Sequence, residues 1–312
     1  MNEDYPRTLA ELSRRFGSEE ACTSSPAQLR WPAGFCCPHC QGAEPWRRGR
    51  GLWLCRQCRK QVSVKSGTVF ADSRLPLPDW FRALGQVPRQ KHGASALGLP
   101  RVMGWGSYET AWPGLHKLRR AMVRPGRDRL RWLVAMEETY VGGERPGKRG
   151  RGAAGKCLVG IAAEVLAPKG IGRIRLLRGP NAAAASLPPA AQALVEPGSV
   201  IRPDDWNGYV GLASASYPRE GIGPAAAEGE NRLPCCPRVA SRRKRWLLGP
   251  HQGAVGPKPL DYYLDEFPFR FNRRTATSRG KLFYRLAQQA VQIEPHPYVR
   301  SVRQRPQPVG VG

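Results

Sequence analysis

Two pairs of cysteines near the N-terminus have the spacing of a metal site. Cys37 and Cys40 form the first C-x-x-C pair, and Cys55 and Cys58 form the second after fourteen intervening residues. Two such knuckles can present four thiolates to one Zn²⁺ in a tetrahedron, which leaves no open position for catalysis. A redox-active C-x-x-C is the alternative, but redox chemistry needs one motif and not two paired ones. We therefore predict a zinc ribbon with a structural metal.

The sequence identifies the metal of this ribbon more clearly than the molecule that the ribbon binds. Cys36 adjoins the first knuckle and is an alternative ligand, although the C-x-x-C spacing favours Cys37. Zinc ribbons serve protein contacts as well as DNA contacts, so the metal site alone does not identify a partner. Arg47, Arg48 and Arg50 in the predicted hairpin favour DNA, because they can neutralise phosphates.

Two acidic residues far apart in the sequence could do the chemistry of a nuclease. Glu137 follows the apolar run 133–136, and Asp204 lies just beyond the apolar pair 200–201. In-line cleavage of a phosphodiester uses two Mg²⁺ ions about 3.5–4 Å apart, and Mg²⁺ prefers hard oxygen ligands. Taken singly, each residue is more simply an ordinary carboxylate at a strand end. The pair is informative only if the fold brings the two together.

The elements expected around these carboxylates do bring them together. The order β-β-β-α-β-α is that of an RNase-H-like nuclease, in which the first and fourth strands lie side by side. Glu137 and Asp204 are then expected at neighbouring strand ends as ligands of Mg²⁺ or Mn²⁺, with Glu138 on the opposite face. The patterns predict strands over 133–136, 157–163, 171–176 and 200–201, and helices over 182–195 and from 206.

A helical segment precedes this region. The pattern predicts a helix from Leu77, a short helix over 95–99 and a third over 107–122, an arrangement compatible with a helix-turn-helix. Ordinary packing of three amphipathic helices, with the basic residues as a solvated face, is the alternative. The predicted DNA contacts are Lys117, Arg119 and Arg120 near the end of the third helix.

The charge of the chain supports a nucleic-acid partner. It carries 50 Lys and Arg residues against 24 Asp and Glu, a formal net charge of +26. DNA is the expected partner, because each neutralised phosphate releases a condensed counterion. An anionic membrane is the competing partner, but no apolar run approaches the ~20 residues of a spanning helix, and the N-terminus lacks the pattern of a signal peptide. We expect a cytoplasmic, nucleoid-associated protein that binds double-stranded DNA and no membrane.

Eight segments spread over the chain form a specific set. They are RWPAGFCCPHC, CRQCRKQVSVKSGTVF, LPLPDWFRAL, GSYETAWPGLHKLRRAM, EETYVGG, PDDWNGY, KRWLLGPHQGAV and LDYYLDEFPFRFNRR. Together they resemble the DDE-type transposases of insertion sequences that have an N-terminal zinc ribbon and an ISXO-like catalytic domain, over nearly the whole chain. The resemblance implies an RNase-H-like fold, divalent-metal catalysis, binding to terminal inverted repeats and strand transfer by a freed 3′-hydroxyl.

The departures from the family pattern concern the catalytic centre. The resemblance implies Asp at the position of Glu137, and it implies Asp204 as the second ligand, with Pro203 in place of the family's Thr. The third site position lies seven residues before a Lys; Lys244 fits that Lys, which places the third position at Pro237. Proline offers no ligand, and we expect it to disturb the helix that presents Lys244.

These departures predict a weakened catalytic centre. Glu137 keeps the charge but has a longer arm than Asp, and a misplacement of ~1 Å can cost ~10²-fold in rate. We therefore expect this copy to be weak or inactive. Lys244 and Arg245 are expected to contact DNA phosphate near the scissile bond.

The sequence thus predicts an α+β multidomain protein that assembles as a homo-oligomer on DNA. The function expected is that of an insertion-sequence transposase with a damaged catalytic centre. The alternative is a catalytically dead DNA-binding relic, while a zinc-ribbon transcription factor would explain the N-terminal half only. The predicted domains are an N-terminal helix (1–30), the zinc ribbon (31–70), a helical DNA-binding region (71–128), an RNase-H-like catalytic domain (129–290) and a disordered tail (291–312).

Overall fold

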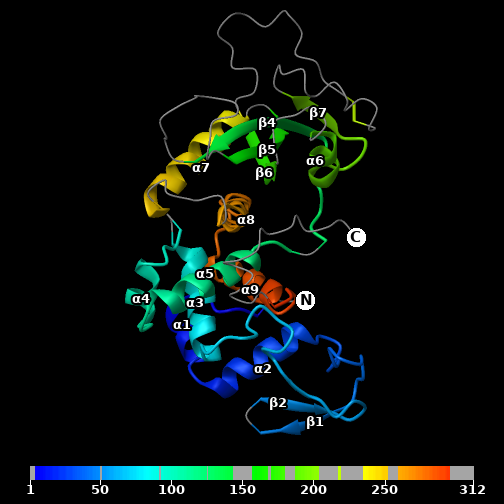
Figure 1. The fold of residues 1–312 in the computed structure, drawn as a ribbon, viewed down its shortest axis with the longest axis vertical. Helices are drawn as coiled ribbons and strands as arrows, with labels where there is room; N and C mark the ends of the chain where they lie inside the picture. Colours follow the sequence, from blue (N-terminus) through cyan, green and yellow to red (C-terminus); the bar gives the residue numbers. More distant parts are fainter. Residues whose placement is uncertain are drawn as a thin grey trace, which may run out of the picture. The chain divides into compact units, whose positions relative to one another are not determined.

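The chain divides into two compact units. The first combines Met1–Gly126 with Thr275–Arg305, and the second consists of Arg127–Arg274 with Pro306–Gly312. The architecture is that of a computed structural model (Figure 1). It describes residues 4–49, 51–90, 93–124, 126–142, 157–167, 170–179, 187–203, 217–218, 235–251 and 259–295.

The first unit is built from short helices and a small sheet. The side chains of Thr8 and Ser18 cap its first two helices by accepting hydrogen bonds from the N–H groups of Glu11 and Ala21. Its helices are α1 (Leu9–Arg15), α2 (Glu19–Arg30), α3 (Leu77–Arg89), α4 (Gly98–Met103), α5 (Tyr108–Arg120) and α9 (Arg279–Ala290), and its strands are β1 (Pro45–Arg48), β2 (Leu52–Cys55) and β3 (Gln61–Ser63).

Three buried phenylalanines join α1, α3 and α9. Phe16, which directly follows α1, stacks on Phe81 of α3 with ring centroids 4.4 Å apart and lies 5.5 Å from Phe283 of α9. In addition, the N–H of Val69 donates a 3.3 Å hydrogen bond to the carbonyl of Ala290. This packing places α9 in the first unit, whereas the sequence analysis assigned its residues to the 129–290 domain.

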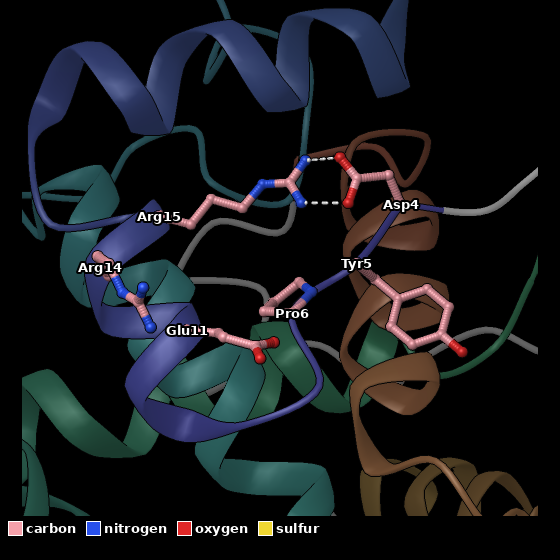
Figure 2. A pocket seen from close by; sticks show the side chains of 6 residues that line it. All are labelled: Asp4, Tyr5, Pro6, Glu11, Arg14 and Arg15. Carbon is pink, nitrogen blue, oxygen red and sulfur yellow. Dashed lines mark hydrogen bonds and ion pairs between the residues drawn. The ribbon is translucent and has the colours of Figure 1, made fainter.

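The N-terminal segment lies against α1 and α9. Figure 2 shows the carboxylate of Asp4 facing the guanidinium of Arg15, which donates two hydrogen bonds of 2.8 Å to it. The ring of Tyr5 lies 5.9 Å from that of Tyr284 in α9. Gly280 permits this approach, because a Cβ at that position would lie 2.1 Å from the carbonyl oxygen of Pro6.

The small sheet is an antiparallel meander in the order β1-β2-β3. Its central strand packs against the segment that follows α2, where Trp53 meets Trp31 edge-on at 5.2 Å and Trp31 lies 4.9 Å from Phe35. One face of the sheet is therefore covered by aromatic side chains of the first unit.

The second unit contains a four-stranded sheet in the order β6-β5-β4-β7. β5 pairs antiparallel with β4 and β6, while β7 pairs parallel with β4. The prediction that the first and fourth strands of this region lie side by side is therefore confirmed. The elements are β4 (Leu133–Val141), β5 (Cys157–Leu166), β6 (Gly170–Gly179), α6 (Leu187–Leu194), β7 (Val200–Pro203), α7 (Cys235–His251) and α8 (Leu260–Phe271).

Each face of this sheet buries a separate core, because side chains alternate along every strand. Ala135, Val159 and Ile174 pack on one face with side chains of α7 and α8. Val134 and Met136 pack on the other face with side chains of α6. Figure 1 shows α7 and α6 at opposite sides of the sheet.

The first strand of this sheet is longer than the sequence analysis predicted. The predicted strand stops at 136, whereas β4 continues to Val141 and pairs its last residues with the start of β5. Thr139, Tyr140 and Val141 are β-branched or aromatic residues, which favour extended backbone. Glu137 therefore lies inside a paired strand, opposite Ile161, and not at its end.

Two predicted elements lie outside the described residues. They are the helix from 206 and the tail after residue 295. None of the helices in the described part of the chain combines the length and the apolar composition needed to cross a lipid bilayer.

Candidate functional site

The four predicted zinc ligands come together in the first unit. The Sγ atoms of Cys37, Cys40, Cys55 and Cys58 all lie within 4.8 Å of one another. Cys37 and Cys58 are 3.6 Å apart, and Cys40 and Cys55 are 3.5 Å apart. A tetrahedron with Zn–S bonds of about 2.3 Å has edges of about 3.8 Å, so this cluster fits one zinc ion.

The backbone of the two knuckles is arranged alike. The residue after each second cysteine has a left-handed backbone, with φ of 63° at Gln41 and 58° at Arg59. The N–H of Cys58 lowers the pKa of the Cys55 thiol to about 7. The pKa of the Cys40 thiol is raised to about 12, because the hydrogen bond from the N–H of Gly42, which lowers it, is outweighed by burial and the neighbouring thiols. The fold thus favours a thiolate at Cys55.

The alternative ligand Cys36 does not belong to the cluster. Its Sγ lies 3.1 Å from the side-chain oxygen of Gln41, as expected for a thiol that donates a hydrogen bond. Within the described residues, the four knuckle cysteines are the one group of three or more His, Cys, Asp or Glu side chains that could hold a metal. The cluster thus contains Cys37 and not Cys36, as the C-x-x-C spacing predicts, and it is consistent with structural zinc.

In the second unit, Glu137 lies on the sheet face covered by α7 and α8. Ala135 and Thr139, two residues to either side, share this face: Ala135 belongs to the core with α7 and α8, and Thr139 contacts α7. One carboxylate oxygen of Glu137 is buried. Glu138 falls on the opposite face by the alternation of the strand.

The second predicted ligand, Asp204, lies outside the described residues, but the strand that leads to it is described. β7 runs parallel to β4, with Leu133 opposite Val200 and Met136 opposite Pro203. In the sequence, Met136 is followed by Glu137, and Pro203 is followed by Asp204.

The helix that carries Lys244 is intact, which corrects the expectation that Pro237 would disturb it. Pro237 is the third residue of α7, and the helix continues through Lys244 to His251. The N–H groups of a first turn have no partner inside the helix, so a proline there removes no hydrogen bond. Lys244 and Arg245 are both exposed, while Pro237 still offers no ligand atom.

Sequence reasoning missed Arg243 on the same helix. Its side chain is only 4% exposed, and it donates a 3.5 Å hydrogen bond to the hydroxyl of Thr139. Its Nε and Nη1 atoms have no hydrogen-bond partner in the described part of the chain, and burial lowers the pKa of the guanidinium to about 10. The helical spacing of Cys236, Val239 and Arg243 was a signal that could have identified this buried face.

Two of the three DNA contacts predicted on α5 are buried. The ammonium of Lys117 donates to the carbonyl of Ala71, and Arg119 donates to the carbonyl of Ala94 at 3.0 Å. Both therefore bind backbone within the first unit, which corrects the prediction that they contact DNA. Arg120 is half-buried, and Tyr108 in the first turn of α5 is 44% exposed.

The basic surface of the zinc ribbon extends beyond the hairpin arginines that the sequence identified, because it includes Arg56 and Arg59. Trp46 on β1 is 36% exposed, and the guanidinium carbons of Arg56 and Arg59 lie 5.4 Å and 4.5 Å from the centroid of its ring. Arg47 and Arg48 beside it are exposed, and among the described residues they have no ion-pair partner. Only Arg56 is paired, with Glu44 at 3.3 Å.

Comparison with known proteins adds two domain matches and one relative. Residues 17–61 match the transposase zinc-ribbon domain, and residues 129–272 match the ISXO2-like transposase domain. The chain is 27% identical over 278 residues to a protein of the transposable element ISH50 from Halobacterium salinarum, an alignment that covers 82% of this chain and 92% of that protein. The first matched segment includes the four cysteines of the cluster, and the second includes Glu137, Asp204 and Lys244.

Proposed function

Because the chain belongs to the DDE transposases, with an ISXO2-like transposase domain behind a transposase zinc ribbon, we propose that it is an insertion-sequence transposase. In this proposal it binds the terminal inverted repeats of its element as a homo-oligomer, cleaves DNA at the ends and joins them to a target. It acts in the cytoplasm on the nucleoid.

The observation that carries the proposal is the parallel pairing of β4 with β7. The strand order β6-β5-β4-β7, with helices on both faces, supports an RNase-H-like domain. Continued by one residue beyond Met136 and Pro203, the register would set Glu137 beside Asp204. Two carboxylates at this point are the oxygen donors that Mg²⁺ or Mn²⁺ prefers.

The roles of the residues follow from this arrangement. Glu137 and Asp204 would hold the divalent metal, which supplies charge stabilisation for the attacking and leaving oxygens when bound. In β4, Glu137 and the residues before and after it all pair with β5, so the backbone of Glu137 is fixed before DNA binds. Lys244 and Arg245 are exposed on α7 and are proposed to contact phosphates.

The DNA-binding role has support from charge and from α4 and α5. The net charge of +26 favours phosphate binding along the whole chain. α4 and α5 are joined by a tight turn at Gly104, whose φ is 70°, and the first turn of α5 is exposed. In a helix-turn-helix the first turn of the second helix meets the base edges, so Tyr108 replaces Lys117 and Arg119 as the proposed contact.

A specific observation favours a second candidate, a DNA-binding relic without catalysis. Pro237 supplies no third ligand, and Arg243 brings a buried cation to the sheet face that holds Glu137. A cation there opposes the binding of a divalent metal by charge repulsion. This candidate keeps the ribbon, the helices and the terminal-repeat binding.

An assay with the element's own terminal-repeat DNA separates the two candidates. Purified protein is mixed with labelled end DNA and Mg²⁺ or Mn²⁺, and both binding and joined products are measured for wild type, Asp204→Asn and Glu138→Gln. Joining that is lost in Asp204→Asn but kept in Glu138→Gln supports the transposase. Binding without joining supports the relic, and absence of both contradicts each candidate.

A further inference from the structure

The zinc ribbon presents two chemically different faces. Trp46 of β1 pairs with Leu54, and Arg47 pairs with Trp53, so Trp46 and Trp53 point to opposite sides of the sheet. Trp53 is packed against Trp31, as described above. Trp46 therefore marks the outer face of the ribbon, which also carries Arg48 two residues further along the edge strand.

The arginines of this outer face belong to the second zinc knuckle. Arg56 lies between Cys55 and Cys58, and Arg59 follows Cys58 directly. Their backbones are fixed by hydrogen bonds from Arg56 N–H to the carbonyl of Glu44 and from Arg59 N–H to the carbonyl of Cys55, each 3.0 Å long. The backbone of the second knuckle thus sets the positions from which both side chains extend.

The ring of Trp46 fixes the positions of the two guanidinium groups. The guanidinium of Arg59 lies 4.5 Å from the ring centroid and that of Arg56 lies 5.4 Å from it, within the range of cation–π attraction. Arg56 is also held by Glu44. Arginine side chains that are ordered before binding lose less conformational freedom when a ligand arrives.

We propose that this outer face is a phosphate clamp for the backbone of double-stranded DNA. Arg56 and Arg59 contact phosphates, and Trp46 is a positioning residue that holds both guanidiniums in place. The inference rests on the DNA-binding role proposed above and adds a site that the family matches do not assign. Duplex DNA is the occupant because Arg48, Arg56, Arg59 and Lys60 are opposed by Glu44 alone among the acidic side chains of this hairpin.

A competing role for the arginines is purely structural. A zinc ion with four thiolates carries a formal charge of −2, and nearby cations could simply offset it. In that case their removal would weaken zinc binding, and DNA binding would follow only indirectly. The test therefore needs zinc content as a second measurement.

The experiment uses the full chain loaded with zinc and a labelled duplex of arbitrary sequence. Binding is measured by fluorescence anisotropy between 50 and 200 mM salt for wild type, for the double variant Arg56→Gln with Arg59→Gln, and for Trp46→Leu and Trp46→Phe. The control is the double variant Arg7→Gln with Arg14→Gln, which removes the same charge from exposed positions in and beside α1.

The clamp predicts a specific pattern in these measurements. The slope of log Kobs against log salt should fall by about 1.8 in the Arg56, Arg59 double variant, at about 0.9 for each lost phosphate contact. Trp46→Leu should weaken binding, and Trp46→Phe should restore most of it because phenylalanine keeps a cation–π face. Zinc content should stay at the wild-type level, and the α1 control should keep the wild-type slope.

Four outcomes would overturn the clamp. They are an unchanged slope in the double variant, an equal loss in the α1 control, loss of zinc from the double variant, and competition by polyglutamate as effective as competition by DNA. Failure of the wild-type protein to bind any duplex would instead contradict the proposed function itself.

Discussion

Met136 of β4 and Pro203 of β7 are partners in a parallel strand pair. The relationship matters because the next residue after Met136 is Glu137 and the next after Pro203 is Asp204. Parallel strands run in the same direction, so successive residues of the two strands stay side by side for as long as the pairing continues. The described residues thus contain the parallel strand pair that leads to both acidic residues.

Restoring the family's ligands should restore activity if this scaffold is intact. We expect the double variant Glu137→Asp with Pro237→Glu to join end DNA at least ~10²-fold faster than wild type, since ~1 Å of misplacement costs about that factor. Pro237 lies in the first turn of a continuous α7, so glutamate there is compatible with the helix. Joined product is measured on gels with the element's ends.

The control for this rescue is Glu138→Asp combined with Pro237→Glu, which shortens a carboxylate on the opposite face of β4. It should join end DNA more slowly than the rescued variant, because only the rescued variant shortens the carboxylate at position 137. If the rescued variant binds end DNA normally but joins no faster, the catalytic defect lies elsewhere in the chain.

The zinc site predicts a sharp contrast between neighbouring cysteines. Cys37→Ser should lose the metal and unfold the ribbon, because structural zinc supplies on the order of 10 kcal/mol or more of folding free energy. Cys36→Ser should keep stoichiometric zinc, since its thiol contacts Gln41 and lies outside the cluster. Zinc content is measured by atomic absorption, and equal loss in both variants would contradict the assignment.

Acidification should release the same zinc, because protons compete with the metal for thiolates. The pKa of Cys55 is already lowered to about 7 by the N–H of Cys58, so this ligand protonates at lower pH than an ordinary thiol. We expect zinc retention at neutral pH and loss as pH falls further. Release that increases on raising the pH from 6 to 8 would have the wrong sign for thiolate ligands.

Replacing Arg243 by methionine should stabilise the second unit. Burial lowers the pKa of Arg243 to about 10, so its charge opposes folding, by about 3 kcal/mol from the size of the shift. The folded pKa is depressed for a cation, so the penalty is complete below pH 10 and shrinks only above it. The increase in unfolding free energy should therefore be equal at pH 6 and pH 8.

Arg245→Met is the matched control for this change, because Arg245 is exposed on the same helix. It should shift stability by no more than about 0.5 kcal/mol. A marked loss of stability in Arg243→Met would show that the guanidinium has an anionic partner in the folded protein.

Gly280 should not tolerate a side chain. A Cβ would lie 2.1 Å from the carbonyl oxygen of Pro6, so Gly280→Ala must displace the N-terminal segment. We expect a loss of about 1–3 kcal/mol, typical of overpacking. Gly106→Ala is the control, because nothing lies within 4 Å of its Cβ position. Denaturant unfolding that gives equal stability for the two variants would contradict the close approach.

The elements and pairings that the sequence predicted correctly are those set by local pattern. Cysteine spacing identified the four side chains that form the cluster, and the order of the predicted elements placed Leu133 and Val200 on neighbouring strands. The ends of the strands were harder to predict from the sequence, because Glu137 interrupts an apolar run without interrupting the backbone pairing of β4. Whether Asp204 completes the site stays a prediction.

The residues that sequence reasoning misassigned depend on contacts between distant segments. Lys117 and Arg119 look like a solvated basic cluster, but their long side chains reach the carbonyls of Ala71 and Ala94. The spacing of residues within α5 gives no sign of these carbonyl acceptors, because they lie in other segments of the chain. Pro237 looked disruptive because the start of α7 is not marked in the sequence. The contact of Trp46 with the arginines of the second knuckle likewise cannot be predicted from the sequence, because it forms only when the ribbon is folded.

The position of α9 has a consequence for how the protein is made. Phe283 completes the aromatic cluster of Phe16 and Phe81, yet it is translated after Arg127–Arg274, the larger segment of the second unit. During translation, the apolar surface of the N-terminal helices therefore stays exposed until nearly the entire polypeptide has emerged from the ribosome. A chain truncated before α9 would therefore lack the ring that completes this cluster, and its first unit should be less stable than that of the full chain.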